Sequence, residues 1–350
     1  MKSVSVQIDL TPWVRAPFSG IGRTAGLAFE SIQRLGTGQF HGVSRQRSSG
    51  IEWLDPSRRL IGWKNRIYHS FEHRLPPVYR SLTVLSLHDL WTLRAGNAWQ
   101  SPEFQKRQGP ILRSAIARAD WITVPSESVL RELQELFPET RERSAAVPWG
   151  PTLKLPPQVP SFSYPELVGG KRTLLTVSVI EPRKNLGKIP AALAQVPGVR
   201  WCLIGKIGYR GQEILDQLTA DCARLGVELV RQEALSDEEL IRQLQAAHAV
   251  VLPSSEEGFG LPALEGALLG RPLFLSEIGP FREIAGAAAA YFDPAQVEEA
   301  LPALLQELVE ASPSEWQALS LAVQERARSL TWDQTAAKFF RVYSALSSGT

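Results

Sequence analysis

The sequence contains very little cysteine and no long apolar run. Cys202 and Cys222 are its only cysteines, and neither has a cysteine or a histidine at the spacing of metal ligands. A disulfide-rich secreted domain is therefore not expected, and reduced thiols in a cytoplasmic protein are expected. Residues 1–13 include Lys2 and Asp9 and lack the apolar stretch of a signal peptide. No segment reaches the roughly 18 apolar residues of a transmembrane helix, so none is expected.

The net charge is small but unevenly distributed. It is +2 overall, yet residues 1–150 hold 20 Lys and Arg against 13 Asp and Glu, a net of +7, and residues 151–350 hold 18 against 23, a net of −5. The basic half suits an anionic partner, such as a membrane surface or a pyrophosphate-linked acceptor, although a solvated surface explains it equally. The alternation of aromatic and basic residues that is typical of RNA-binding proteins is absent, so no nucleic-acid partner is expected. The basic residues gather at Arg45, Arg47, Arg58, Arg59, Lys64 and Arg66.

Apolar runs of strand length alternate with helical patterns along both halves of the chain. The expected strands are 4–10, 66–70, 82–87, 121–124, 145–147, 173–179, 201–205, 227–230, 249–253 and 272–275. The expected helices include one that follows a glycine-rich turn within 20–35, and others at 104–119, 126–137, 212–225, 262–269 and 332–346. This alternation predicts an α/β fold in which parallel sheets are covered by helices on both faces.

A proline-rich break divides the chain. Six prolines fall within the 18 residues of 148–165, and glycines lie at 150, 169 and 170. This composition is typical of an interdomain connection, and the chain length suits two domains. We therefore expect two doubly wound, Rossmann-like domains at residues 1–160 and 161–332. Open α/β sheets bind ligands at the carboxyl ends of their strands, so two such sheets facing each other are expected to form an active site between them.

The segment 253–266, PSSEEGFGLPALEG, combines the end of a buried strand, a glycine loop and the start of a helix. Exposed N–H groups at such a helix start suit a diphosphate, and Gly258 and Gly260 allow the backbone to approach it closely. Glu265 is expected in the first helical turn, where the helix dipole favours an ionised carboxylate that can accept hydrogen bonds from a ribose diol. Glu257 lies eight residues earlier, on the loop. The alternative is a cap and a turn in an ordinary strand–helix unit.

These two glutamates, within EGFGLPALE, resemble the signature of the retaining glycosyltransferase family 4. The segments 178–186, SVIEPRKNL, and 202–209, CLIGKIGY, are also similar to that family. The resemblance covers nearly the whole chain and is most specific over 176–294. It implies the GT-B architecture, in which the first Rossmann-like domain binds the acceptor and the second binds a nucleotide-sugar donor. It also implies that the final helix, from about residue 333, completes the first domain.

The resemblance implies roles for individual residues. Lys184 would pair with the donor diphosphate, and Arg183 beside it would supply a second positive charge. Many family members have an arginine five positions before that lysine, where this chain has Val179, so the role of Arg183 as its replacement is open. Glu265 would hold the ribose, and Glu257 would bind hydroxyls of the transferred sugar near the reacting carbon. Donor contacts from the loop and helix start are assigned to Gly258, Phe259, Gly260 and Leu261.

In the first half, two short motifs follow expected strands. His88, within LHDL, is similar to the family histidine that reaches the donor sugar, although a lone histidine is more often structural. Gly20 and Gly22, within SGIGR, are expected on a glycine loop before a helix and resemble the family loop near the diphosphate and the acceptor. A GxG sequence alone is weak evidence, so their assignment depends on the position after the first strand.

No Asp-x-Asp cluster stands out, and the donor phosphates already have cationic partners, so neither a metal ion nor another cofactor is expected. The resemblance implies that the configuration of the sugar is retained, by a same-face displacement in which the leaving phosphate accepts the proton of the acceptor hydroxyl. The EPRKN and GKIGY segments resemble those of mannosyl- or deoxyhexosyl-transferring family members. This resemblance implies a GDP-mannose-like donor, and UDP-sugars stay open. The expected acceptor is a glycan or a lipid-linked glycan, and peripheral contact with the inner face of an anionic membrane is compatible with the basic half.

Two other functions stay open at this point. A sugar-nucleotide epimerase on the same fold would isomerise the donor without any acceptor. A non-catalytic GT-B protein would bind a sugar nucleotide or support a partner enzyme, and the departure at Val179 is its only support in the sequence. Glu257, Glu265 and Lys184, all present, favour the glycosyltransferase.

Overall fold

The computed structural model describes residues 5–53, 60–61, 66–75, 78–79, 81–94, 99–155 and 164–348. Contacts between residues divide the chain into two compact units. Unit 1 comprises Met1–Asn97, Pro102–Thr152 and Leu330–Thr350, and unit 2 comprises Ala98–Ser101 and Leu153–Ser329. Apart from the short segment Ala98–Ser101, the chain passes between the units next to Thr152 and again next to Leu330. Among the described residues, no helix combines the length and the hydrophobicity needed to cross a bilayer.

Unit 1 contains a parallel sheet with the strand order β3-β2-β1-β5-β7-β8-β9. Its strands are β1 (Ser5–Asp9), β2 (Gln39–Ser44), β3 (Glu52–Trp53), β5 (Arg66–Ser70), β7 (Leu82–Ser86), β8 (Trp121–Val124) and β9 (Ser144–Ala146). A separate parallel pair joins β4 (Leu60–Ile61) to β6 (Val78–Tyr79). The central strands β5 and β7 are buried along almost their whole length because helices cover both faces of the sheet.

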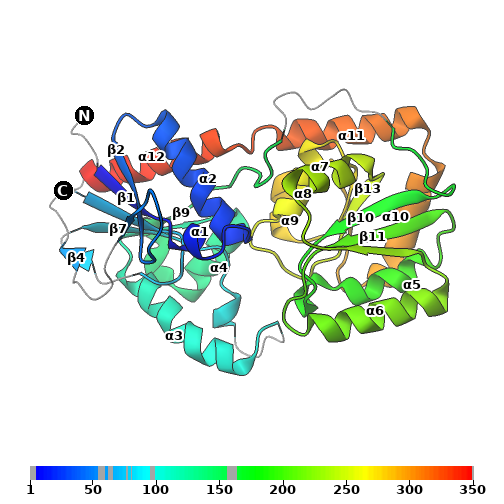
Figure 1. Cartoon of the computed structure of the whole chain (residues 1–350), viewed down its shortest axis with the longest axis horizontal. Helices are drawn as coiled ribbons and strands as arrows, with labels where there is room; N and C mark the ends of the chain where they lie inside the picture. Colours follow the sequence, from blue (N-terminus) through cyan, green and yellow to red (C-terminus); the bar gives the residue numbers. More distant parts are fainter. Residues whose placement is uncertain are drawn as a thin grey trace. The chain divides into compact units, whose positions relative to one another are not determined.

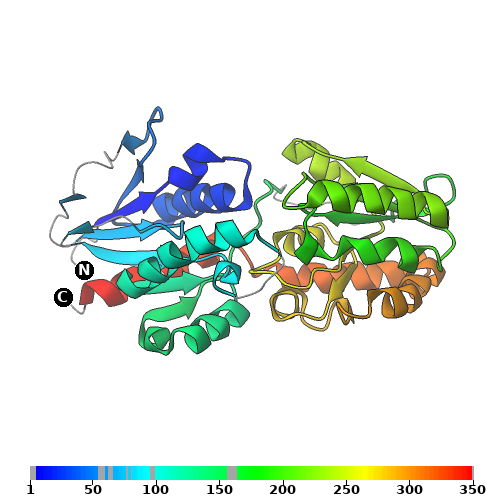
Figure 2. The same ribbon diagram turned by 90° about the horizontal axis from the view of Figure 1, so that it is seen from below.

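The helices of unit 1 include one from the far end of the chain. They are α1 (Thr11–Arg15), α2 (Gly20–Leu35), η1 (Trp91–Leu93), α3 (Pro102–Arg118), α4 (Glu127–Leu136), η2 (Pro138–Arg143) and α12 (Trp332–Ser348). Helices α2 and α12 pack together, and α3 lies on the opposite face of the sheet (Figures 1 and 2). Within this unit, the Trp332 indole donates to the carbonyl oxygen of Pro151 at 2.7 Å. Helix α12 is thereby held to the chain segment that leaves unit 1.

Unit 2 contains a six-stranded parallel sheet with the order β12-β11-β10-β13-β14-β15. Its strands are β10 (Arg172–Val177), β11 (Val199–Ile204), β12 (Leu229–Gln232), β13 (Ala249–Leu252), β14 (Leu273–Ser276) and β15 (Ala290–Phe292). Its helices are η3 (Pro182–Lys184), η4 (Leu186–Lys188), α5 (Ile189–Leu193), α6 (Gly211–Leu225), α7 (Asp237–Ala246), α8 (Leu261–Leu268), α9 (Gly279–Ala285), α10 (Val297–Glu310) and α11 (Pro313–Ala327). Helices α5 and α6 cover one face of the sheet, and α8 and α11 the other (Figure 1).

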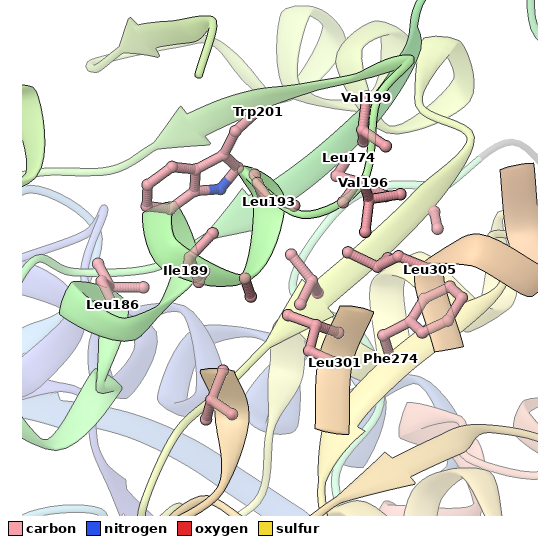
Figure 3. Packing of buried hydrophobic residues seen from close by; sticks show 14 of the residues in the cluster. Leu174, Leu186, Ile189, Leu193, Val196, Val199, Trp201, Phe274, Leu301 and Leu305 are labelled. Atoms are coloured by element: carbon pink, nitrogen blue, oxygen red, sulfur yellow. The ribbon is translucent and has the colours of Figure 1, made fainter. Parts of the chain in front are cut away.

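The core of unit 2 is a continuous apolar cluster that joins the sheet to α5 and α10 (Figure 3). Trp201 on β11 is fully buried, and its indole nitrogen donates to the Thr176 hydroxyl at 3.0 Å. Ile189 and Leu305 are also fully buried in this cluster. Complete burial of such a side chain contributes about 1.5–3 kcal/mol, so this cluster fixes the sheet from which the site residues project.

Both sheets have a topological switch point, where the chain leaves one side of the first strand and continues on the other. In unit 1 this point lies between β1 and β5, and in unit 2 between β10 and β13. Loops that follow two such strands diverge to opposite faces, so a crevice opens at their carboxyl ends. The segments after these four strands are therefore where each unit is built to bind a ligand.

The predicted fold class is confirmed, and most predicted strands and helices are present within a few residues. Ser126 caps α4, with its hydroxyl accepting from the Val129 N–H at 3.2 Å, and Ser236 forms a capping box with Glu239 at the start of α7. The sequence did not predict β2, because Phe40 and Val43 are its only apolar residues and only Val43 of these two is buried. The sequence predicted domain boundaries at residues 160 and 332, and the compact units divide next to Thr152 and Leu330.

Candidate active site

In unit 2, the loop after β10 carries the two predicted cations. It forms the short helix η3, and Asn185 ends it in the left-handed conformation, with a φ of 54°. Lys184 is buried although it is a lysine, and Arg183 beside it is mostly buried. The Arg183 guanidinium lies 2.6 Å from a carboxylate oxygen of Glu181, and its backbone carbonyl accepts from the Ser255 N–H at 2.8 Å. These contacts tie the loop after β10 to the loop after β13.

Glu257, on the loop after β13, accepts hydrogen bonds from three side chains. The Lys184 ammonium donates to Oε1 at 2.6 Å, the Ser254 hydroxyl donates to Oε1 at 2.8 Å, and the Arg183 guanidinium donates to Oε2 at 3.1 Å. Burial alone would raise the pKa of Glu257, but Lys184 and Arg183 lower it to about 2. Burial lowers the pKa of Lys184, and Glu257 opposes that change. The result is a compact cluster of charged groups at the switch point.

Helix α8 begins directly after this loop without a side-chain cap. Its N-cap is Gly260, whose φ of 105° is disfavoured for any residue with a Cβ atom. A Cβ atom at this position would also lie 2.8 Å from the Phe281 ring. Gly258 and Phe259 are buried, and Leu261 is the first helical residue. The uncapped N–H groups and the positive end of the helix dipole suit an anionic ligand.

Glu265 does not lie where the sequence predicted within α8. The helix begins at Leu261, one residue earlier than expected, and its first turn holds no acidic residue. Glu265 therefore projects from the second turn, where the dipole of the helix end has less influence on its charge. Its carboxylate is buried and accepts a hydrogen bond from the Leu153 N–H at 3.2 Å. The residue still belongs to the α8 side of the site.

In unit 1, His88 follows β7 and its ring packs 4.9 Å from that of Trp149, centroid to centroid. Its Nε2 lies 2.9 Å from the carbonyl oxygen of Phe71. A carbonyl can only accept, so Nε2 carries the proton and Nδ1 keeps a lone pair. Burial lowers the pKa of His88 to about 4, so the ring is neutral at pH 7. Within the described part of the chain, Nδ1 has no hydrogen-bond partner, which makes it available to a ligand.

Gly20 and Gly22 lie in the first turn of α2, not on a loop before it as the sequence predicted. Ser19 caps this helix, and its hydroxyl accepts from the Gly22 N–H at 3.0 Å. A Cβ atom on residue 22 would lie 2.1 Å from the Ala16 carbonyl oxygen. Close packing between α1 and α2 is therefore sufficient to explain Gly22, and Gly20 is exposed.

A pocket of about 90 Å³ lies beside His88 within unit 1. Its lining includes Arg15, Glu72, His73 and Asp89, the last of which adjoins His88 within the LHDL motif. Glu72 follows β5, so its position after a strand at the switch point was the available signal. Sequence reasoning also assigned no role to Glu181 and Ser254 in unit 2. They follow β10 and β13, so the same signal was available for them.

Of the predicted basic cluster, two of the members that the structure describes are engaged in contacts within unit 1. Arg45 is mostly buried and pairs with Asp9 and Glu72, which neutralise its charge. Arg47 stacks on the Trp53 ring at 4.4 Å from its centroid. Arg58, Arg59 and Lys64 lie outside the described residues.

Residues 162–324, which make up most of unit 2, match the family model described as "Glycosyl transferases group 1". The protein therefore contains a group 1 glycosyltransferase domain, and it is similar to glycosyltransferase family 4. The predicted family, enzyme class and GT-B fold are thus confirmed. The match contains the loops after β10 and β13 together with α8, so the charged cluster and Glu265 belong to the family domain.

Relatives and solved structures extend the similarity beyond that domain. O-antigen chain mannosyltransferase B from Escherichia coli is 27% identical over 312 residues, which cover 84% of this chain and 78% of the relative. Serotype-specific mannosyltransferase WbdA, also from Escherichia coli, is 28% identical over 71% of this chain, but the match spans only 32% of that longer protein. The structure of sucrose-phosphate synthase from Thermosynechococcus elongatus matches over 100% of both chains, with a TM-score of 0.74 and 17% identity. At that identity the structural match shows the fold alone.

Proposed function

We propose that this glycosyltransferase moves a hexosyl unit from a nucleoside diphosphate sugar to a glycan or lipid-linked acceptor, with retention of configuration. Unit 2 would bind the donor and unit 1 the acceptor. The observation that carries the proposal is the buried cluster in which Lys184 and Arg183 converge on Glu257 beside the uncapped start of α8. Two cations and a helix N-terminus together provide the electrostatic environment that a departing diphosphate needs.

The donor is positioned by groups on both sides of the switch point of unit 2. Lys184, Arg183 and the backbone at Gly258, Phe259, Gly260 and Leu261 face the diphosphate in this proposal. The Glu265 carboxylate accepts hydrogen bonds from the ribose hydroxyls. Glu257, which is ionised at neutral pH because of its cationic neighbours, accepts hydrogen bonds from hydroxyls of the transferred sugar. In unit 1, the neutral His88 ring keeps Nδ1 as an acceptor for a hydroxyl of a bound sugar.

The chemical step is a same-face displacement. The bond between the anomeric carbon and the phosphate oxygen breaks, and the bond to the acceptor oxygen forms on the same face of the sugar. The proton of the acceptor hydroxyl passes to the departing phosphate oxygen. Lys184 and Arg183 stabilise the negative charge that develops on this phosphate, so we propose that the reaction needs no metal ion.

A GDP-mannose-like donor is favoured, with UDP-sugars as the alternative. Both Escherichia coli relatives carry the name mannosyltransferase, and one is named for the O-antigen chain. These names, with the EPRKN and GKIGY segments, support a mannosyl donor and a polysaccharide acceptor. The first test of the donor is a thermal-shift panel of UDP, GDP, ADP and their sugar conjugates on the wild type and on Glu265→Ala.

In that panel, binding to the native state raises the melting temperature by mass action. We expect one nucleotide to raise it selectively in the wild type and to lose that effect in Glu265→Ala. Glu228→Ala, which changes an exposed carboxylate of the same unit, is the matched control and should respond like the wild type. The absence of any shift at millimolar nucleotide in the wild type would contradict the proposed function.

A further inference from the structure

The pocket of unit 1 contains an arginine that is half exposed yet fixed by a buried carboxylate. Arg15 is the last residue of α1 and lines the pocket together with Glu72. Its guanidinium contacts Glu72 Oε1, and the exposed fractions of the two side chains are 50% and 3%. A long side chain that reaches solvent but is held at its tip by an immobile group is preorganised, so a ligand needs to order it very little.

Glu72 is held in the interior of unit 1 because it belongs to a buried network of charged side chains. It also binds Arg45, whose guanidinium lies 3.1 Å from Asp9 Oδ2. Asp9 in turn accepts from the Tyr68 hydroxyl at 2.7 Å. The negative charges of Asp9 and Glu72 balance the positive charges of Arg15 and Arg45. Of these four side chains, that of Arg15 is the exposed one.

Arg34 shows that this arrangement differs from an ordinary surface ion pair. Its side chain is 58% exposed, close to the value for Arg15, but its partner Asp333 is 52% exposed. Both members of that pair can move, which is why exposed pairs stabilise proteins little. The partner of Arg15 is only 3% exposed and cannot move freely, so it fixes the orientation of the Arg15 guanidinium as well as balancing its charge.

The guanidinium of Arg15 keeps free donors. It has five N–H bonds, and within the described part of the chain its only hydrogen-bond or ion-pair partner is Glu72. Parallel N–H bonds of a guanidinium match two oxygens of a phosphate, with charge assistance. The other polar groups of the pocket, which include Asp89 and the neutral His88 ring, suit sugar hydroxyls.

We propose that Arg15 binds a phosphate group of the acceptor, so that the acceptor is a sugar carrying a phosphate or diphosphate. This inference rests on the proposed function in one respect, because it assigns the pocket of unit 1 to the acceptor. The phosphate can belong to a soluble sugar phosphate or to a lipid-linked sugar diphosphate. Both sources present the same oxygens to Arg15.

The test compares the wild type, Arg15→Gln and Arg34→Gln by isothermal titration calorimetry with four probes. Inorganic diphosphate and mannose 1-phosphate carry the proposed group, methyl α-mannoside lacks it, and farnesyl diphosphate represents the lipid-linked source. Phosphate binding in unit 2 is common to the three proteins and cancels in the comparison. We expect Arg15→Gln to weaken binding of a phosphate probe in unit 1 by about tenfold or more, since hydrogen bonds to charged groups have that value. Arg34→Gln should bind like the wild type.

If the wild type binds mannose 1-phosphate more tightly than methyl α-mannoside and Arg15→Gln loses this preference, the acceptor is a soluble sugar phosphate. If farnesyl diphosphate gives the same result, the acceptor is lipid-linked. Equal affinity of all three proteins for every phosphate probe would overturn the proposal, as would an equal loss for methyl α-mannoside. If Arg15→Gln folds poorly, the double variant Arg15→Gln, Glu72→Gln keeps the buried charges balanced and replaces it. Nucleotide binding is measured separately in the Glu265 panel, so failure there and failure here are distinguishable.

Discussion

The Lys184 ammonium lies 2.6 Å from Glu257 Oε1, although the two residues are 73 positions apart in the chain. The separation is bridged because β10 and β13 are neighbours in the sheet of unit 2, so the loops that follow them meet. Burial of either charge alone would be unfavourable, and the pair offsets part of that cost. Loss of one partner would leave the other as a buried charge.

The first prediction concerns Lys184→Gln. This variant removes a positive charge that the proposal places beside the leaving diphosphate, while Arg183 and Ser254 still bind Glu257. Removal of one such electrostatic group commonly lowers kcat by about 10²–10³, so we expect a fall of that order in kcat/KM for the nucleotide sugar. Steady-state kinetics with the donor found in the binding panel provide the measurement. Lys171→Gln, which breaks an exposed pair with Glu228, should turn over like the wild type, and unchanged kinetics in Lys184→Gln would contradict the assigned role.

A second prediction isolates the contact between Glu265 and the ribose. Removal of a hydroxyl that binds a carboxylate costs about 10- to 100-fold in affinity, so a 2′-deoxynucleoside diphosphate should bind the wild type that much more weakly than the ribonucleotide. In Glu265→Gln the two nucleotides should bind almost equally. Calorimetric titration of both nucleotides into both proteins measures this coupling. A preference for ribose of the same size in the variant would place the ribose elsewhere.

A third prediction concerns the start of α8. Gly260 has a φ of 105°, and a Cβ atom there would lie 2.8 Å from the Phe281 ring. Gly260→Ala should therefore lower the free energy of unfolding by about 1–3 kcal/mol, as other strained backbone positions do. Gly187→Ala is the matched control, because a Cβ atom at that glycine meets nothing within 4 Å. Urea denaturation of both variants measures the difference, and equal stabilities would remove strain as the reason for this glycine.

Local sequence signals were sufficient for much of unit 2. Strand β10, which begins at Arg172, and strand β13, which ends just before Pro253, are short apolar runs in the sequence. Ser236 is followed by Glu239 at the spacing of a capping box. The pairing of Lys184 with Glu257 was not predictable in the same way, because it depends on which strands are neighbours. Glu265 was placed in the wrong turn because Pro262 was taken as the first helical residue, whereas it occupies the second position.

The pocket of unit 1 shows what sequence patterns leave out. Glu72 and Arg15 are ordinary charged residues in the sequence, and nothing local indicates that one is buried and the other half exposed. Their relationship arises from the packing of α1 beside the end of β5, which is a tertiary event. Arg45 illustrates the same point, since a residue assigned to a basic surface is a buried partner of Asp9.

The last prediction concerns the acid stability of unit 1. His69 is fully buried on β5, with Nδ1 2.7 Å from the Tyr343 hydroxyl of α12 and Nε2 2.8 Å from the Ser86 hydroxyl. Burial lowers its pKa from 6.5 to about 3. Between these two values the unfolded chain binds a proton that the folded chain does not. The free energy of unfolding therefore falls as the pH decreases through this range.

His69→Gln keeps hydrogen-bonding groups but cannot be protonated. Between pH 7 and pH 5 the wild type should lose about 2 kcal/mol more of its free energy of unfolding than this variant loses, from a slope of about 1.4 kcal/mol per pH unit below 6.5. Glu257 does not interfere, because its pKa of about 2 confines its effect to pH values below about 4.5. Urea denaturation at both pH values measures the loss, and His41→Gln, at an exposed position on β2, should retain the wild-type dependence. An identical loss in the wild type and in His69→Gln would show that His69 is protonated in the folded protein, and the network that joins β5 to α12 would then have to contain a charged histidine.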